Sequence, residues 1–110
     1  MKCDSTPRRQ DAESRVKENE GELRLRGIRC ERQAEVPIRY KGKRLATALR
    51  LDLLVEKLVV VECKATHEYN RVFAAQTLTY LRLLDMKLGL VINFGEPLVK
   101  NGIHRVVNGL

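Results

Sequence analysis

The chain has 110 residues, a formal net charge of +7 and 44% hydrophobic residues. This length gives one small domain with a modest core, and no apolar run approaches the roughly 20 residues that span a membrane. The N-terminus lacks the apolar core of a secretory signal, so we expect a cytoplasmic protein. The basic charge favours anionic partners, nucleic acid first, although a basic surface can also serve solubility alone.

The N-terminal region carries few apolar side chains. Residues 1–12 are polar and without periodicity, which predicts a disordered tail before one domain over residues 13–110. A thinly amphipathic helix is expected from about Asp11 to Arg26, ended by Gly27.

Three strands are expected next. Residues 28–40 alternate apolar and polar side chains, which predicts a half-exposed strand, and Pro37 suits a sheet edge. The expected apolar face holds Ile28, Cys30, Ala34, Val36, Ile38 and Tyr40, and the polar face holds Arg29, Glu31, Gln33, Glu35 and Arg39. Lys41-Gly42 supplies a turn into a second strand over residues 44–56, and a third strand covers residues 58–65.

The second and third strands are expected to form a hairpin around Lys57, in which residues whose numbers sum to 114 face each other. This register places Asp52 opposite Glu62 and Arg50 opposite Lys64, with all four side chains on one face. Two carboxylates this close repel unless a cation lies between them, and hard oxygen ligands suit Mg²⁺ or Mn²⁺. On polar flanks such charges would be ordinary solvated groups, but in an apolar stretch they favour a partner or a function.

A second helix and two further strands complete the pattern. Residues 70–85 have helical spacing, with Gln76 and Tyr80 four residues apart on one face. A buried strand is expected over residues 87–94 and a short final strand over residues 103–107. Up to the short final strand, the predicted order is α-β-β-β-α-β, an α/β fold.

The three cysteines are odd in number and unpatterned. Cys30 and Cys63 lie in strand-like apolar stretches, where buried free thiols are the common outcome, so disulfides are not expected. A zinc site on Cys63 and His67 would lack a second pair of ligands.

These elements, with Asp52, Glu62-Cys63-Lys64 and the later Gln76-x-x-x-Tyr80, resemble the PD-(D/E)XK nuclease superfamily, and its RecB-like branch in particular. More closely, residues 22–110 resemble the GxxExxY family of small bacterial proteins. The similar segments are ELRLRGI, VPIRYKGKRL, LDLLVE, VVVECKA, AQTLTYLRLLDMKLGLVINFG and KNGIHRVVN. The resemblance implies a restriction-endonuclease-like αβββαβ core, with a mixed central sheet flanked by helices, in one nuclease-like domain.

The resemblance also implies roles for individual residues. Asp52 and Glu62 would ligate Mg²⁺ or Mn²⁺ together with the Cys63 carbonyl. Lys64 would orient the attacking water and stabilise charge that develops on the phosphate.

Four further residues have a structural alternative to a functional role. Gln76 and Tyr80 would line the site and position the strand or Lys64, with a helix-face hydrogen bond and core packing as the respective structural alternatives. Arg50 and His67 are near enough in sequence to contact a substrate phosphate, but a surface role is favoured for both.

The motif that names the GxxExxY family is absent. Its Gly, Glu and Tyr would fall at Arg9, Ala12 and Arg15. A glutamate from the first helix assists metal binding in many superfamily members, and the shifted candidates here are Glu13, Glu18 and Glu22. A short or degraded first helix would leave one face of the sheet uncovered, so a homodimer or a degenerate relative is also open.

Three functions are therefore open. The first is Mg²⁺-dependent hydrolysis of phosphodiester bonds in nucleic acid, with DNA favoured over RNA. The second is nucleic-acid binding without catalysis, which would be salt-dependent and insensitive to metal removal. The third is a protein-interaction module built on an uncovered sheet face or edge strand. The cluster of Asp52, Glu62 and Lys64 favours the first.

Overall fold

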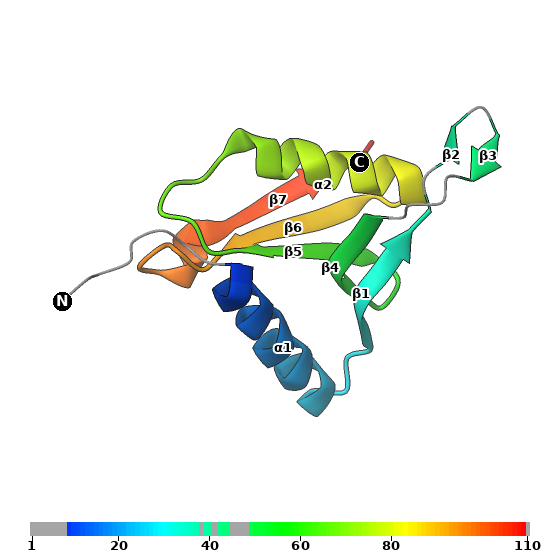
Figure 1. The fold of residues 1–110 in the computed structure, drawn as a ribbon. Helices are drawn as coiled ribbons and strands as arrows, with labels where there is room; N and C mark the ends of the chain where they lie inside the picture. Colours follow the sequence, from blue (N-terminus) through cyan, green and yellow to red (C-terminus); the bar gives the residue numbers. More distant parts are fainter. Residues whose placement is uncertain (1–8, 38, 41, 45–48, 110) are drawn as a thin grey trace.

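A computed structural model describes residues 9–37, 39–40, 42–44 and 49–109 of the chain. Its elements are α1 (Arg9–Leu25), β1 (Cys30–Val36), β2 (Arg39–Tyr40), β3 (Lys43–Arg44), β4 (Leu49–Val55), β5 (Val59–Lys64), α2 (Arg71–Leu84), β6 (Leu88–Asn93), the 3₁₀ helix η1 (Val99–Gly102) and β7 (Ile103–Val107). The predicted α/β order is confirmed, with the small β2–β3 hairpin added between the first and second core strands (Figure 1).

The main sheet of the described residues has five strands in the order β1-β4-β5-β6-β7. Strands β5 and β6 are parallel and the other neighbours are antiparallel, so the sheet is mixed, as predicted. Helix α2 connects the two parallel strands and packs mainly on β6 and β7. Helix α1 packs on β1, β4 and β5 from the opposite face, and β1 and β4 run steeply across the direction of β5 (Figure 1).

The core lies in two clusters, one on each face of the sheet. The buried residues of the α2 face are Val36, Leu51, Val60, Tyr80, Leu81, Val91 and Val106. Those of the α1 face are Val16, Leu53, Val61 and Cys63. Strand β5 contributes to both clusters, so it is covered on both faces.

Helix α2 has well-defined ends and a close contact with the sheet. The Asn70 side chain accepts a hydrogen bond from the Val72 N–H at 2.9 Å, and Asp85 ends the helix in the left-handed conformation. At Gly89 of β6 a Cβ would lie 2.7 Å from the Thr77 side chain. Glycine therefore lets α2 approach the sheet closely.

Helix α1 spans 17 residues, close to the length expected for a helix from about Asp11 to Arg26, so it is not shortened. It begins at Arg9, however, so residues 9–12 belong to the helix and not to the expected tail. The rest of the predicted tail, residues 1–8, lies outside the described residues. Among the described residues of α1, Val16 supplies the buried apolar side chain.

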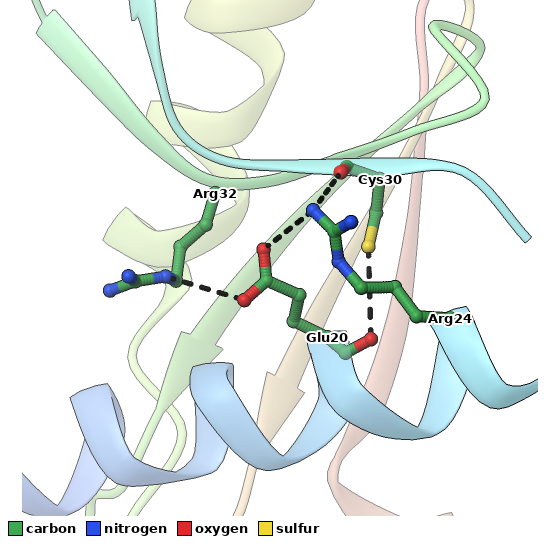
Figure 2. Close-up of polar contacts among 4 residues, drawn as sticks. All are labelled: Glu20, Arg24, Cys30 and Arg32. Carbon is green, nitrogen blue, oxygen red and sulfur yellow. Dashed lines mark hydrogen bonds and ion pairs between the residues drawn. The ribbon is translucent and has the colours of Figure 1, made fainter.

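The C-terminal half of α1 contacts β1 mainly through polar groups. Figure 2 shows the Glu20 carboxylate between two arginines, with Arg24 at 3.2 Å and Arg32 of β1 at 3.5 Å. Arg24 also donates to the Cys30 carbonyl at 3.2 Å, and the Cys30 thiol lies 3.9 Å from the Glu20 carbonyl. We call Glu20, Arg24, Cys30 and Arg32 the polar clamp.

The first two predicted core strands are shorter than expected. Strand β1 ends at Val36, directly before Pro37, which has no N–H to continue a ladder. Residues 39–40 pair instead with residues 43–44 in the separate hairpin. Of the predicted turn, Lys41 lies outside the described residues and Gly42 has a φ of +77°.

Candidate functional site

The site lies where β4 and β5 stop pairing with each other, a point that we call the fork. The predicted hairpin register is confirmed for three pairs, of which Leu53↔Val61 is the last. Beyond this pair, β4 stays paired with β1 while β5 stays paired with β6. The ladder pairs that we expected for Asp52 with Glu62 and for Arg50 with Lys64 do not form, which corrects the sequence prediction.

Side-chain hydrogen bonds replace the ladder at the fork. The Cys63 N–H donates to Asp52 Oδ2 at 2.8 Å, and the Asp52 N–H donates to Glu62 Oε1 at 3.4 Å. The two carboxylates therefore do lie together, but through backbone donors and not as a cross-strand pair. Arg50 pairs with Glu35 of β1 instead, with their charged groups 3.6 Å apart.

Glu62 is the most unusual ionisable group of the described site. Its side chain is only 4% exposed. Burial, followed by the neighbouring charge of Asp52, raises the pKa of Glu62 to about 9. A buried carboxyl group next to a second one is therefore held neutral at physiological pH unless a cation joins them.

A cleft of about 530 Å³ opens at this fork. Its lining residues are Ala12, Glu13, Gln33, Arg50, Asp52, Glu62, Cys63, Lys64, Ala65, Thr66, Gln76 and Tyr80. All the predicted catalytic and metal-binding residues, with Arg50 and Glu13, thus come to one place, whereas His67 is exposed and does not line the cleft.

Lys64 is held from the α2 side of the cleft. Its Nζ lies 3.4 Å from Gln76 Oε1 and 5.0 Å from the centre of the Phe73 ring. The amide oxygen and the aromatic face both favour an ammonium group at this point. The contact between Phe73 and Lys64 could not be predicted from the sequence, because it depends on how α2 packs on β5.

Tyr80 and Cys63 are largely buried. Tyr80 is 5% exposed, and burial, then the charges of Glu62 and Asp52, raises the pKa of its hydroxyl. Burial likewise raises the pKa of the Cys63 thiol to about 12. That thiol lies in the α1-face cluster, 3.9 Å from the Asn19 amide nitrogen. Cys63 therefore offers the cleft its backbone and not a thiolate.

Asn93 is a structural support of the cleft that sequence analysis missed. Its buried side chain accepts from the N–H groups of Thr66 and Gly95 and donates to the Thr66 carbonyl, all within 3.0 Å. These bonds fix the segment that follows Lys64. The available signal was a polar residue near the end of a strand that the sequence predicts to be buried.

The donor set fits a hard divalent cation in chemistry, with two carboxylates and a backbone carbonyl at hand. Cys63 donates its N–H toward Asp52, and the N–H and C=O of an extended residue point to the same side, so the Cys63 carbonyl faces the same gap. Among the described residues, no three His, Cys, Asp or Glu side chains gather as a metal-binding group.

The shifted glutamate candidates differ in position. Glu13 lines the cleft, as part of the N-terminal half of α1. Glu18 and Glu22 instead form ion pairs at 3.0 Å with Arg15 and Arg26 of the same helical region. The geometry therefore selects Glu13 as the acid that α1 brings to the site.

Comparison with known proteins decides the family. A sequence model of the PD-(D/E)XK nuclease superfamily matches residues 19–106. The chain belongs to this superfamily. Membership in the PD-(D/E)XK superfamily indicates a nuclease-like domain and suggests an interaction with nucleic acid, and the nucleases of this superfamily generally use divalent metal ions.

The fold of this chain is also found among solved structures. The crystal structure of SSO0001 matches with a TM-score of 0.67 and 18% sequence identity, over 88% of this chain and 50% of that one. The chain thus spans half the length of SSO0001, and the likeness concerns the fold alone. No curated protein matches the chain. None of the described helices has the length and apolar character needed to cross a membrane.

Proposed function

We propose that this domain is a divalent-metal-dependent nuclease that hydrolyses phosphodiester bonds in nucleic acid. The observation that carries the proposal is the pairing of Asp52 with the buried Glu62, with Lys64 held beside them in one cleft. Superfamily membership and the net charge of +7 support the same conclusion.

Asp52 and Glu62 would hold Mg²⁺ or Mn²⁺, together with the Cys63 carbonyl. The bound ion would supply positive charge to the scissile phosphate and to the attacking water. Glu62 would release its proton to solvent in order to hold the ion, because a carboxyl with a raised pKa is a ligand only in its ionised form.

Lys64 is the residue we expect to act on the substrate. Its ammonium group, held by Gln76 and Phe73, would orient the attacking water and stabilise the charge that develops on the phosphate. Tyr80 keeps its proton and can donate a hydrogen bond at the cleft wall.

Assignment to the RecB-like branch and to the GxxExxY family is part of the proposal. The cleft position of Gln76 and Tyr80 supports the former. The position of Glu13 supports a shifted form of the helix glutamate, one residue after Ala12, where the family motif would place it. DNA remains favoured over RNA as the substrate.

Cleavage assays test this function. Labelled single- and double-stranded DNA and RNA oligonucleotides would be incubated with the protein in Mn²⁺, Mg²⁺ or EDTA. We expect metal-dependent cleavage that is lost in Asp52→Asn and Lys64→Ala. The matched control is Lys87→Ala, an exposed lysine before β6 at the end of the strand opposite the cleft. Cleavage that survives both site substitutions, or EDTA, would contradict the proposal.

Self-association is a second proposal, with its own observation. Strand β7 lies at the edge of the sheet, and its Ile103 and Val107 are 46% and 40% exposed. A second copy could cover these side chains. Sedimentation velocity should then show a dimer that Val107→Lys dissociates, and a wild-type monomer at high concentration would refute it.

A further inference from the structure

Gln33 has a backbone conformation that nothing local requires. Among the described residues, four other than glycine have a positive φ. Glu56 and Lys57 form the tight turn between β4 and β5, and Asp85 ends α2, so each of these has an ordinary reason. Gln33 has a φ of +61° in the middle of β1. Such a residue in a strand persists only where the surrounding structure enforces it.

The ladder between β1 and β4 is interrupted at this residue. Arg32 pairs with Leu53 and Ala34 pairs with Leu51. The row between them, Gln33 with Asp52, is missing from the ladder although the register on both sides is the same. The unusual conformation therefore lies directly opposite a predicted metal ligand.

Strand β1 changes faces at Gln33. Side chains two residues apart in a regular strand lie on the same face. Here Arg32 contacts Glu20 of α1, whereas Ala34 and Val36 pack into the cluster of the α2 face. The regular alternation expected for residues 28–40 is therefore wrong at this point.

Strand β4 changes faces in the same row, at Asp52. Leu53 belongs to the cluster of the α1 face, and Leu51 belongs to that of the α2 face. The kink at Gln33 and the reversal at Asp52 thus form one joint feature of two paired strands. Gln33 also lines the same cleft as Asp52.

We propose that Gln33 is a positioning residue for Asp52, and that it acts through its left-handed backbone and not through its amide side chain. The kink opens the ladder opposite Asp52. Asp52 then turns its N–H to Glu62 and its carboxylate to the Cys63 N–H at the fork. The link to catalysis rests on the proposed function, whereas the positioning itself does not.

Substitutions that differ in their tolerance of positive φ test this inference. Gln33→Gly accepts the conformation at no steric cost and removes the amide, whereas Gln33→Val strongly disfavours it. Lys57→Gly and Lys57→Val are the matched controls, because Lys57 has a similar φ of +55° in the turn away from the cleft. Gln33→Thr, also β-branched, replaces Gln33→Val if the valine variant does not fold.

The first readout is hydrogen exchange of the Cys63 amide by NMR, without metal. The protection of the Cys63 amide is divided by the protection of the amides of Val59–Val61 in the intact β4–β5 ladder. Global destabilisation lowers both values and therefore cancels in this ratio. We expect Gln33→Gly and both Lys57 variants to keep this ratio, and Gln33→Val to lower Cys63 protection about tenfold or more. Equal losses in Gln33→Gly and Gln33→Val, or no loss in Gln33→Val, would overturn the inference.

The second readout is Mn²⁺ affinity by calorimetry in the same variants. We expect Gln33→Val to bind at least about tenfold more weakly than Gln33→Gly, since a misplaced carboxylate is a poorer ligand. If the wild type binds no Mn²⁺, the proposed function fails while the exchange ratio still decides the role of Gln33.

Discussion

The two helices hold the sheet in different ways, and the candidate site lies between them. Helix α2 contributes buried Thr77, Tyr80 and Leu81 and approaches β6 closely at Gly89. Helix α1 contributes the buried Val16 and otherwise contacts the sheet through the polar clamp, whose ion pairs are partly exposed. Apolar burial stabilises far more than partly exposed ion pairs do. The face that holds Lys64 is thus the rigid one, and the helix that brings Glu13 is held weakly.

The largest expected effect is on the free energy of unfolding, when one core residue from each helix is shortened to alanine. Leu81→Ala should lower the free energy of unfolding by about 2–5 kcal/mol, because its side chain is fully buried. Val16→Ala should cost only about 1–2 kcal/mol, since it removes less buried apolar surface. Urea unfolding of both variants measures this difference, and equal losses would contradict the contrast between the helices.

The next effect concerns Glu62, between the two helices. Its folded-state pKa is raised to about 9 from 4.5, so between these values the folded protein binds more protons than the unfolded chain. The free energy of unfolding without metal should therefore fall as pH rises through this window. Glu62→Gln should remove this dependence and stabilise the metal-free protein at pH 8 by at least about 1 kcal/mol. Parallel pH profiles in wild type and variant would count against a buried neutral carboxyl.

A smaller effect tests how α2 holds Lys64. Phe73→Leu removes the aromatic face 5.0 Å from the Lys64 ammonium, and should lower cleavage about 3- to 10-fold at unchanged Mn²⁺ affinity. Phe73→Tyr keeps a ring and should retain most of the activity. If leucine and tyrosine variants are equally active, the ring does not position Lys64.

The smallest effect is expected in the polar clamp. Glu20→Gln weakens the ion pairs with Arg24 and Arg32 and should change the free energy of unfolding by no more than about 1 kcal/mol. Thermal unfolding in low and high salt measures it. A loss comparable to that of Leu81→Ala would show that the clamp, and not Val16, holds α1.

Much of the fold, and most of the residues that line the site, could be predicted from the sequence alone. The hairpin register followed from a turn centred on Lys57 and a side-chain period of two, and it placed Asp52 and Glu62 close together. Gln76 and Tyr80 could be placed together because a helix brings residues four apart to one face.

The remaining features depend on tertiary structure. The reversal at Gln33 was missed because hydrophobic patterning assumes regular strands, and a polar residue in an alternating stretch reads as solvent-facing. Where β4 separates from β5, the Cys63 backbone N–H donates to the Asp52 carboxylate, and hydrophobic patterning gives no sign of this bond. The place of Glu13 at the cleft depends on how α1 docks, and that docking is largely polar.

Calorimetric titration of Mn²⁺ into wild type and Asp52→Asn tests the central claim most directly. At equal folded concentration, the account predicts binding to the wild type that releases protons and strengthens as pH rises toward 9, because Glu62 must ionise. Asp52→Asn should lose this binding while keeping the fold. No binding by the folded wild type, or equal binding by Asp52→Asn, would contradict the account.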